Sequence, residues 1–180
     1  CCITGTMKTN DVISIGDRFG LVGLNFGTIE NIKVRNLEVE YTFTKTLTED
    51  ASVFIGIIAG ANEAEADAEN GGIIRNCEVT DSKITIMKDD GFTASGSVRI
   101  LCAAIAGINP KNQEQVAQPK ISNCLVKDFE CDASALSDNE KVAIYLAQVV
   151  QTCNQNIKDN ITNCCVFITR QGLVSDKYCP

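Results

Sequence analysis

The chain has 180 residues, an apolar share of 44% and a formal net charge of −7, which together predict one folded domain. Its lysines and arginines are scattered, and neutralising phosphates needs a basic stripe, so nucleic acid is excluded as an expected partner. The absence of histidine removes the commonest zinc ligand and general base, and no apolar run approaches the roughly 20 residues that span a bilayer.

The predicted elements begin with an apolar segment that recurs along the chain. It reads GLVGLN at 20–25, GIIAGAN at 56–62 and AAIAGIN at 103–109, so each copy places an Asn two residues after a Gly. A fourth copy at 142–150 lacks the glycine and is compatible with a strand or a short helix. We expect a strand there.

A second signature, Ile-x-Asn-(Ile/Cys)-x-Val, follows each copy of the first. Its asparagines are Asn31, Asn76, Asn123 and Asn163, which are separated by 45, 47 and 40 residues. The apolar alternation slips by one residue at each Asn, as at a corner, and Asn tolerates the left-handed backbone conformation. We expect the four to stack as an inward or corner ladder, with four independent turns as the alternative.

A third strand with alternating apolar residues follows, as at 37–43 and 82–87. One such unit cannot bury its apolar face alone, so we expect successive units to stack about 4.8 Å apart. The sequence therefore predicts an all-β fold: a parallel β-solenoid (β-helix) of about four coils, with three short strands per coil and loop inserts on one edge. The single domain covers 1–180, with coils at approximately 12–50, 51–96, 97–138 and 139–180. The expected core stacks are Ile29/Ile74/Ile121/Ile161, Ile32/Cys77/Cys124/Cys164, Val34/Val79/Val126/Val166 and Val39/Ile84/Cys131.

The first copy resembles a known repeat. Residues 19–34, FGLVGLNFGTIENIKV, are similar to the GLUG motif, and the later copies match it in part. The resemblance implies repeats of large secreted or surface-attached proteins, often adhesin-like, and brings no catalytic residues with it.

The ten cysteines form no CxxC pair, which favours disulfides in an oxidising compartment over zinc or redox motifs; buried free thiols are the alternative. Cys77, Cys124 and Cys164 fall at one repeat position, so we expect them on neighbouring strands at a separation that a disulfide accepts. Only two of the three can pair at once. Cys165 is expected to face outward, as a candidate partner for Cys153 or Cys179.

The inserts at 63–72 and 110–120 are expected to project from one edge of the solenoid, where a binding surface would lie. The first insert carries Glu63, Glu65, Asp67 and Glu69, which make a weak Ca²⁺ candidate beside the favoured interpretation as a solvated loop. No other cofactor is expected. Asn160 begins the sequon Asn-Ile-Thr and is a glycosylation candidate.

Acidic residues of successive coils are not expected to line up at a shared position, and no catalytic constellation is predicted. We therefore expect a non-catalytic structural or adhesive module, secreted or at the cell surface, within a larger protein or fibre. Its expected partners are protein neighbours at the solenoid ends or the loop edge, or a glycan or host-surface ligand. The alternatives are a polysaccharide-active β-helix enzyme and an intracellular scaffold with free thiols.

Overall fold

The computed structural model describes residues 1–10, 16–44, 46–65, 71–110, 118–150 and 160–169. This part of the chain is all-β, apart from one turn of 3-10 helix, η1 (Ser134–Leu136). All the pairings between its strands are parallel. In the same part of the chain, no helix has the length and hydropathy needed to cross a membrane.

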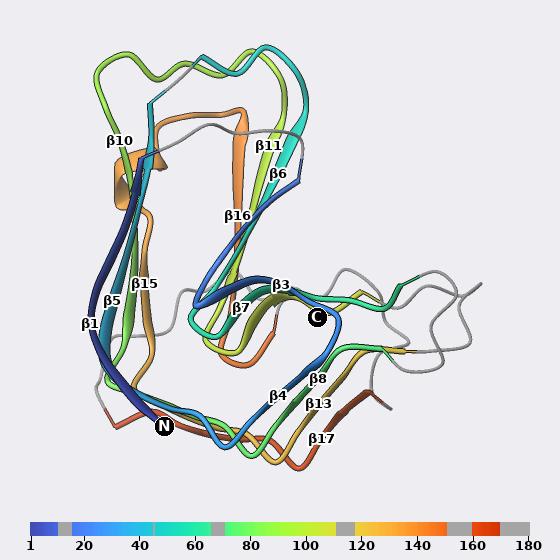
Figure 1. The fold of residues 1–180 in the computed structure, drawn as a ribbon. Helices are drawn as coiled ribbons and strands as arrows, with labels where there is room; N and C mark the ends of the chain where they lie inside the picture. Colours follow the sequence, from blue (N-terminus) through green and yellow to red (C-terminus); the bar gives the residue numbers. More distant parts are fainter. Residues whose placement is uncertain (11–15, 45, 66–70, 111–117, 151–159, 170–180) are drawn as a thin grey trace.

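The strands form four sheets, which appear in Figure 1 as separate runs of neighbouring strands. Sheet A contains β1 (Cys2–Asn10), β5 (Lys33–Phe43), β9 (Glu78–Thr80), β10 (Lys83–Lys88), β14 (Leu125–Lys127), β15 (Glu130–Asp132) and β18 (Cys165–Phe167). Sheet B contains β2 (Asp17–Phe19), β6 (Ala51–Gly56), β11 (Val98–Ala103) and β16 (Val142–Ala147). Sheet C contains β3 (Val22–Asn25), β7 (Ala59–Asn62) and β12 (Ala106–Ile108). Sheet D contains β4 (Thr28–Glu30), β8 (Ile73–Arg75), β13 (Lys120–Ser122) and β17 (Ile161–Thr162).

The chain visits sheets B, C, D and A in this order and then repeats the order. Thus β6 to β10 are followed by β11 to β15, and each strand of the second set pairs with its counterpart in the first. The expectation of three strands per repeat is therefore wrong, because the second set alone has five.

Two left-handed corners explain the extra strands. The first corner lies at Asn31, Asn76, Asn123 and Asn163, whose φ angles are 58°, 54°, 53° and 52°. The second lies five residues later, at Asn36, Asp81 and Asp128, with φ angles of 51°, 48° and 50°. Asn and Asp are the residues with side chains that adopt this conformation most readily. The second corner breaks sheet A into two short strands in the later repeats.

The register of the sheets confirms the expected alignment of the stacks, although Val166, at the end of one stack, is exposed and not part of the core. In sheet D, Ile74 lies between Ile29 and Ile121, and Ile121 pairs in turn with Ile161. In sheet A, the register aligns Val34, Val79, Val126 and Val166, and also Val39, Ile84 and Cys131. The fourth apolar segment is confirmed as a strand, β16, paired along its whole length with β11.

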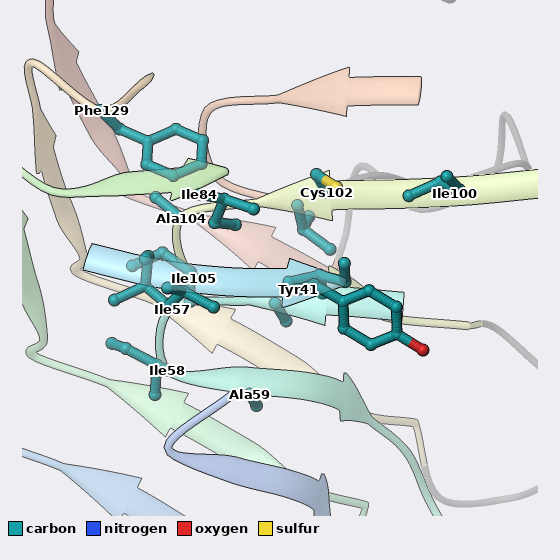
Figure 2. Close-up of a cluster of buried hydrophobic side chains, with 14 of the residues drawn as sticks. Tyr41, Ile57, Ile58, Ala59, Ile84, Ile100, Cys102, Ala104, Ile105 and Phe129 are labelled. Atoms are coloured by element: carbon teal, nitrogen blue, oxygen red, sulfur yellow. The ribbon is translucent and has the colours of Figure 1, made fainter. Parts of the chain in front are cut away.

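The core lies between the sheets and consists mainly of β-branched side chains. Figure 2 shows Ile57, Ile58, Ile84, Ile100 and Ile105 among the side chains of this one cluster, and each is at most 1% exposed. Burying one such side chain contributes about 1.5–3 kcal/mol. Because these residues come from different repeats, no single repeat forms a complete core.

Sheets B and C meet so closely at their shared corner that only glycine fits. A Cβ on Gly107 would lie 2.5 Å from the backbone N of Ile55, and one on Gly60 would lie 2.4 Å from the backbone N of Phe19. Both glycines belong to the recurring first segment. In these two copies the glycine is thus explained by close packing against the backbone of the sheet B strand of the preceding repeat.

Strand β1 was not expected from the sequence, which placed the first coil at residues 12–50. It pairs with β5 from Cys2 to Asn10, with an irregularity between Ile3 and Gly5. Gly5 has a φ of 127°, which residues with side chains rarely adopt. Sheet A therefore has one additional strand, β1, at its amino-terminal edge that the repeats did not predict.

Candidate functional site

A buried asparagine ladder, formed by Asn25, Asn62 and Asn109, runs along sheet C. The Asn25 amide Nδ2 donates to Asn62 Oδ1 at 2.7 Å, and Asn62 Nδ2 donates to Asn109 Oδ1 at 2.8 Å. All three side chains are buried, and Asn62 and Asn109 are completely enclosed. Hydrogen bonds of buried amides satisfy groups that would otherwise be costly to remove from water.

The buried asparagine ladder also holds the start and the end of each insert. Asn62 Nδ2 lies 3.0 Å from the carbonyl O of Gly72, and Asn109 Nδ2 lies 3.4 Å from that of Pro119. In the first repeat, Asn25 Oδ1 accepts from the backbone N of Gly27 at 3.2 Å. The ladder therefore closes the turn between sheets C and D in the first three repeats, whatever the length of the insert.

The expected asparagine ladder, Asn31, Asn76, Asn123 and Asn163, is a set of exposed corner residues. Their conformation is the expected one, and Asn123 Nδ2 donates to Asn76 Oδ1 at 3.3 Å. All four side chains are exposed. The buried ladder is instead made by the asparagines of the first signature, and the Gly-x-Asn pattern was the signal that marked them.

A cysteine ladder, formed by Cys77, Cys124 and Cys164, lies at the entry to sheet A. The backbone N of Leu125 donates to the carbonyl O of Cys77, and that of Cys165 to the carbonyl O of Cys124, which places the three cysteines on adjacent strands. All three are free thiols here, and the disulfide expected between two of them stays a prediction. Cys77 and Cys124 are buried, and Cys164 is partly buried.

The thiols of the cysteine ladder interact with one another. A hydrogen bond from the Cys124 thiol lowers the pKa of Cys77 to about 7 and that of Cys164 to about 6. The same contacts, with Cys164 first and Cys77 second, raise the pKa of Cys124. The Cys124 thiol donates to the carbonyl O of Ser122 at 3.3 Å, so it can stabilise a neighbouring thiolate only by giving up that bond, and only one thiolate at a time. Cys124 is therefore the cysteine that contacts both of the others.

Two other described cysteines, Cys165 and Cys102, lie outside this ladder. Cys165 is exposed, as expected, while its candidate partners Cys153 and Cys179 lie outside the described residues. A second contact, not expected from the sequence, joins Cys102 of sheet B to Cys131 of sheet A. Burial, followed by this contact, raises the pKa of Cys102 well above its usual value.

The acidic insert does not assemble a calcium site within the described residues. Glu63 forms an ion pair with Arg18, in which Oε1 accepts from both Nε at 3.0 Å and Nη2 at 2.8 Å. Glu65 is exposed, and Asp67 and Glu69 lie outside the described residues. No group of three metal-ligating side chains occurs in the part of the chain that the structure describes.

The glycosylation candidate Asn160 lies immediately before β17. Its amide nitrogen, the atom that a glycan would join, is buried and has no hydrogen-bond partner. Glycosylation at Asn160 stays a prediction, and it requires this nitrogen to become accessible.

An open acidic pocket lies beside the second corner, and it corrects the expectation that acids of successive repeats do not align. It is lined by Asn36, Leu37, Glu38, Asp81, Ser82, Lys83, Asp128 and Glu130. The aligned acids are Asp81 and Asp128, the second-corner residues of successive repeats, whereas Lys83 separates Glu38 from Glu130 in the register. Asp128 is 3% exposed, and its two carboxylate oxygens accept from the backbone N and the Oγ1 of Thr169, each at 2.6 Å. The hydrogen bonds of Asp128 thus hold the segment after β18.

Comparisons with known proteins identify no relative whose site could be compared with this one. No protein-family model, no curated protein and no solved structure matches the chain.

Proposed function

We propose that the chain is a non-catalytic structural or adhesive module of a secreted or cell-surface protein, folded as a parallel β-solenoid of the GLUG type. The observation that carries the proposal is the repeated order of sheets B, C, D and A, in which strands one repeat apart pair in parallel. Such a fold offers a rigid surface built from the outward side chains of many strands. Its partners are protein neighbours at the ends of the stack or at the insert edge, or a glycan or host-surface ligand.

The solenoid part of the proposal predicts that one whole coil can be removed. Deleting residues 77–123 joins Asn76 to Cys124 and leaves the Ile-x-Asn-Cys-x-Val corner and every remaining strand in register. We expect the shortened chain to keep a β-rich circular dichroism spectrum and a cooperative thermal transition, at a lower Tm.

The matched control removes half a coil, residues 77–100, and joins a sheet D corner directly to a sheet B strand. This deletion is shorter but puts the later strands out of register, so we expect it to unfold the chain. Equal loss of structure in both deletions would argue against a solenoid, since a single non-repeating core does not tolerate either.

The compartment is tested by counting thiols in the protein as it is isolated from its natural source. An extracellular module is expected to have at least one disulfide involving Cys124, which lies between its two candidate partners. Alkylation without reduction, followed by peptide mass spectrometry, reports which cysteines are free. Full alkylation of all ten would favour the intracellular scaffold instead.

The acidic pocket supports one alternative, a polysaccharide-active enzyme, because glycoside hydrolysis uses two carboxyl groups. The engagement of both Asp128 oxygens by Thr169 supports the structural interpretation. We expect no new reducing ends when the protein is incubated with acidic and neutral polysaccharides. A product that disappears in the Asp81→Asn variant would favour the enzyme.

A further inference from the structure

The large apolar side chains that the described residues expose lie in the first and the last repeat. They are Val22 and Phe26 in the first repeat, and Val166, Phe167 and Ile168 in the last. We call the outer edges of β1 to β4 the N-terminal end, and those of β15 to β18 the C-terminal end. Exposed apolar groups at both ends are typical of surfaces that contact other protein.

The core stacks are incomplete at the same two ends. In sheet D, Ile74 and Ile121 are fully buried, whereas Ile29 and Ile161, which end the stack, are partly exposed. Sheet B shows the same pattern, because the stack that contains Ile55 and Cys102 ends in partly exposed Phe19 and Leu146.

The two ends are complementary because each repeat is related to the next by a shift along the stack, so the last repeat offers the edges that the first repeat would pair with. Among the described strands, β16 and β17 have no neighbour on the side opposite β11 and β13, and β2 and β4 have none on the side opposite β6 and β8. All these strands are parallel. A second copy placed one repeat further along would therefore pair its β2 with β16, and its β4 with β17, in the register used inside the molecule.

In sheet A, the N-terminal end carries a copy of the strand that ends the C-terminal side. Cys1-Cys2-Ile3 matches Cys164-Cys165-Val166, and the register gives both the same place. Ile3 pairs with Val34 just as Val166 pairs with Val126. The carbonyl O of Cys1 accepts from Lys33 as that of Cys124 accepts from Cys165. The β1 of a second copy and the chain's own β18 would thus occupy the same place beside β14.

We propose that the two ends form a head-to-tail interface between copies of this chain, in which β1 of one copy replaces β18 beside β14 of the next. The inference rests on the structural role proposed above and names the partner at the solenoid ends. Strand β1 pairs through eight residues with β5, whereas β18 pairs through three with β14 and is held beyond them by the two hydrogen bonds between Thr169 and Asp128. The shorter pairing makes β18 the strand that yields. A heterologous contact of this kind leaves a free end on each copy and extends into a filament.

The charges at the junction agree with this register. Lys8, Glu40, Thr85 and Asp132 share one position across sheet A. Lys8 of an arriving copy would therefore lie beside Asp132, while each keeps its present partner, Glu40 at 2.6 Å and Lys83 at 3.5 Å. Opposite charges on adjacent strands stabilise a sheet, and like charges would have opposed the contact.

Aromatic contacts at the junction agree as well. Arg18 lies over the ring of Phe54, 5.9 Å from its centre, and the register of sheet B aligns Arg18, Phe54, Leu101 and Tyr145. Tyr145 of one copy would thus face Arg18 of the next from the side opposite Phe54, giving the guanidinium a second aromatic neighbour.

The test uses two end variants of the full chain, Ile29→Lys at the N-terminal end and Ile161→Lys at the C-terminal end. We expect the wild type to form concentration-dependent oligomers in sedimentation velocity. Each variant alone should associate about 100-fold more weakly, because a lysine at the junction would bury an unpaired charge. Mixed in equal amounts, the variants should form dimers and nothing larger, since each supplies the intact end that the other lacks.

The matched control is Thr162→Lys, which places the same charge on the outward face of β17, at the position that would lie beside Glu30 of the next copy. It should associate at least as tightly as the wild type, because it places opposite charges on adjacent strands. A wild type that stays monomeric at high concentration would overturn the inference, and so would a mixture that stays monomeric while both variants keep the wild-type circular dichroism spectrum. Either outcome leaves the coil-deletion result, and with it the proposed solenoid, unaffected.

Hydrogen exchange distinguishes strand replacement from loose association. Backbone amides of β16 and β17 should gain protection in the oligomer, because their outer edges become paired. The amide of Asp128, which now donates to the carbonyl O of Phe167, should find a new acceptor in the arriving β1 and stay protected. Peptide 163–169, which contains the Cys165 amide that now donates to Cys124, should lose protection. Unchanged protection of this peptide in the oligomer would rule out replacement of β18.

Discussion

Replacing Gly107 with alanine is expected to lower the free energy of unfolding by about 3 kcal/mol or more, at the upper end of what overpacking costs. The added Cβ would meet the backbone N of Ile55 at 2.5 Å and the carbonyl O of Gly60 at 2.7 Å. Both contacts are with backbone, which cannot turn aside as a flexible side chain can. Since domains are stable by about 5–15 kcal/mol, the loss is a large part of the total. Thermal unfolding followed by circular dichroism should show a fall in Tm of about 6–12 °C.

Gly91→Ala is the matched control for this substitution. A Cβ at Gly91 would have one neighbour within 4 Å, Asp89 Oδ1 at 3.7 Å, which is an ordinary contact. We expect its Tm to stay within a degree or two of the wild type. If Gly107→Ala melts like Gly91→Ala, sheets B and C are not in the close contact described above.

Replacing Asn62 with alanine should cost about 3 kcal/mol or more, because it removes the middle of the buried asparagine ladder. Asn109 Oδ1 loses its donor at 2.8 Å and Asn25 Nδ2 loses its shortest acceptor, at 2.7 Å, while the carbonyl O of Gly72 keeps only the backbone N of Lys120 as donor. Each buried polar group left without a partner costs about 1–3 kcal/mol. Chemical denaturation should show the loss as a lower midpoint, and proteolysis should show earlier cleavage in the insert that Asn62 holds.

Asn123→Ala makes the same chemical change at an exposed corner. It removes one hydrogen bond, to Asn76 at 3.3 Å, and places alanine at a φ of 53°. We expect a cost of about 1–2 kcal/mol from the left-handed backbone alone. A larger effect at Asn123 than at Asn62 would mean that the exposed asparagines, and not the buried ones, stabilise the fold.

The sequence predicted the stacking register because the register is anchored by a repeated corner residue. Once Asn31, Asn76 and Asn123 are aligned, Ile29 must fall beside Ile74 and Val34 beside Val79, and the structure pairs them so. The number of strands was not predictable in the same way. The second corner uses Asn36 in one repeat and Asp81 and Asp128 in the next two, so no single residue type occupies it in all three.

The sequence left open whether Asn31, Asn76, Asn123 and Asn163 point inward or lie at a corner, and it did not predict the separate buried asparagine ladder, for a related reason. Both signatures contain a recurring Asn, and spacing alone does not distinguish a residue that turns the chain from one that points into the core. The distinction lies in the neighbours. Asn62 comes two residues after Gly60, which packs against the backbone of another strand, whereas Asn76 comes directly after an exposed Arg75. The acidic pocket was missed because its residues align only when the second corner is known.

The spacing of the paired strands has a consequence for how the chain folds. Strands that become neighbours are about one repeat apart, as Ile29 is from Ile74 and Ile74 from Ile121. Closing loops of that length costs conformational entropy before any strand pairing can offset the loss with hydrogen bonds and buried surface. The first pairing is therefore expected to be slow. Each later repeat adds to an edge that already exists. On the ribosome the chain would therefore wait for its second repeat to emerge, and then grow one repeat at a time from its amino-terminal side.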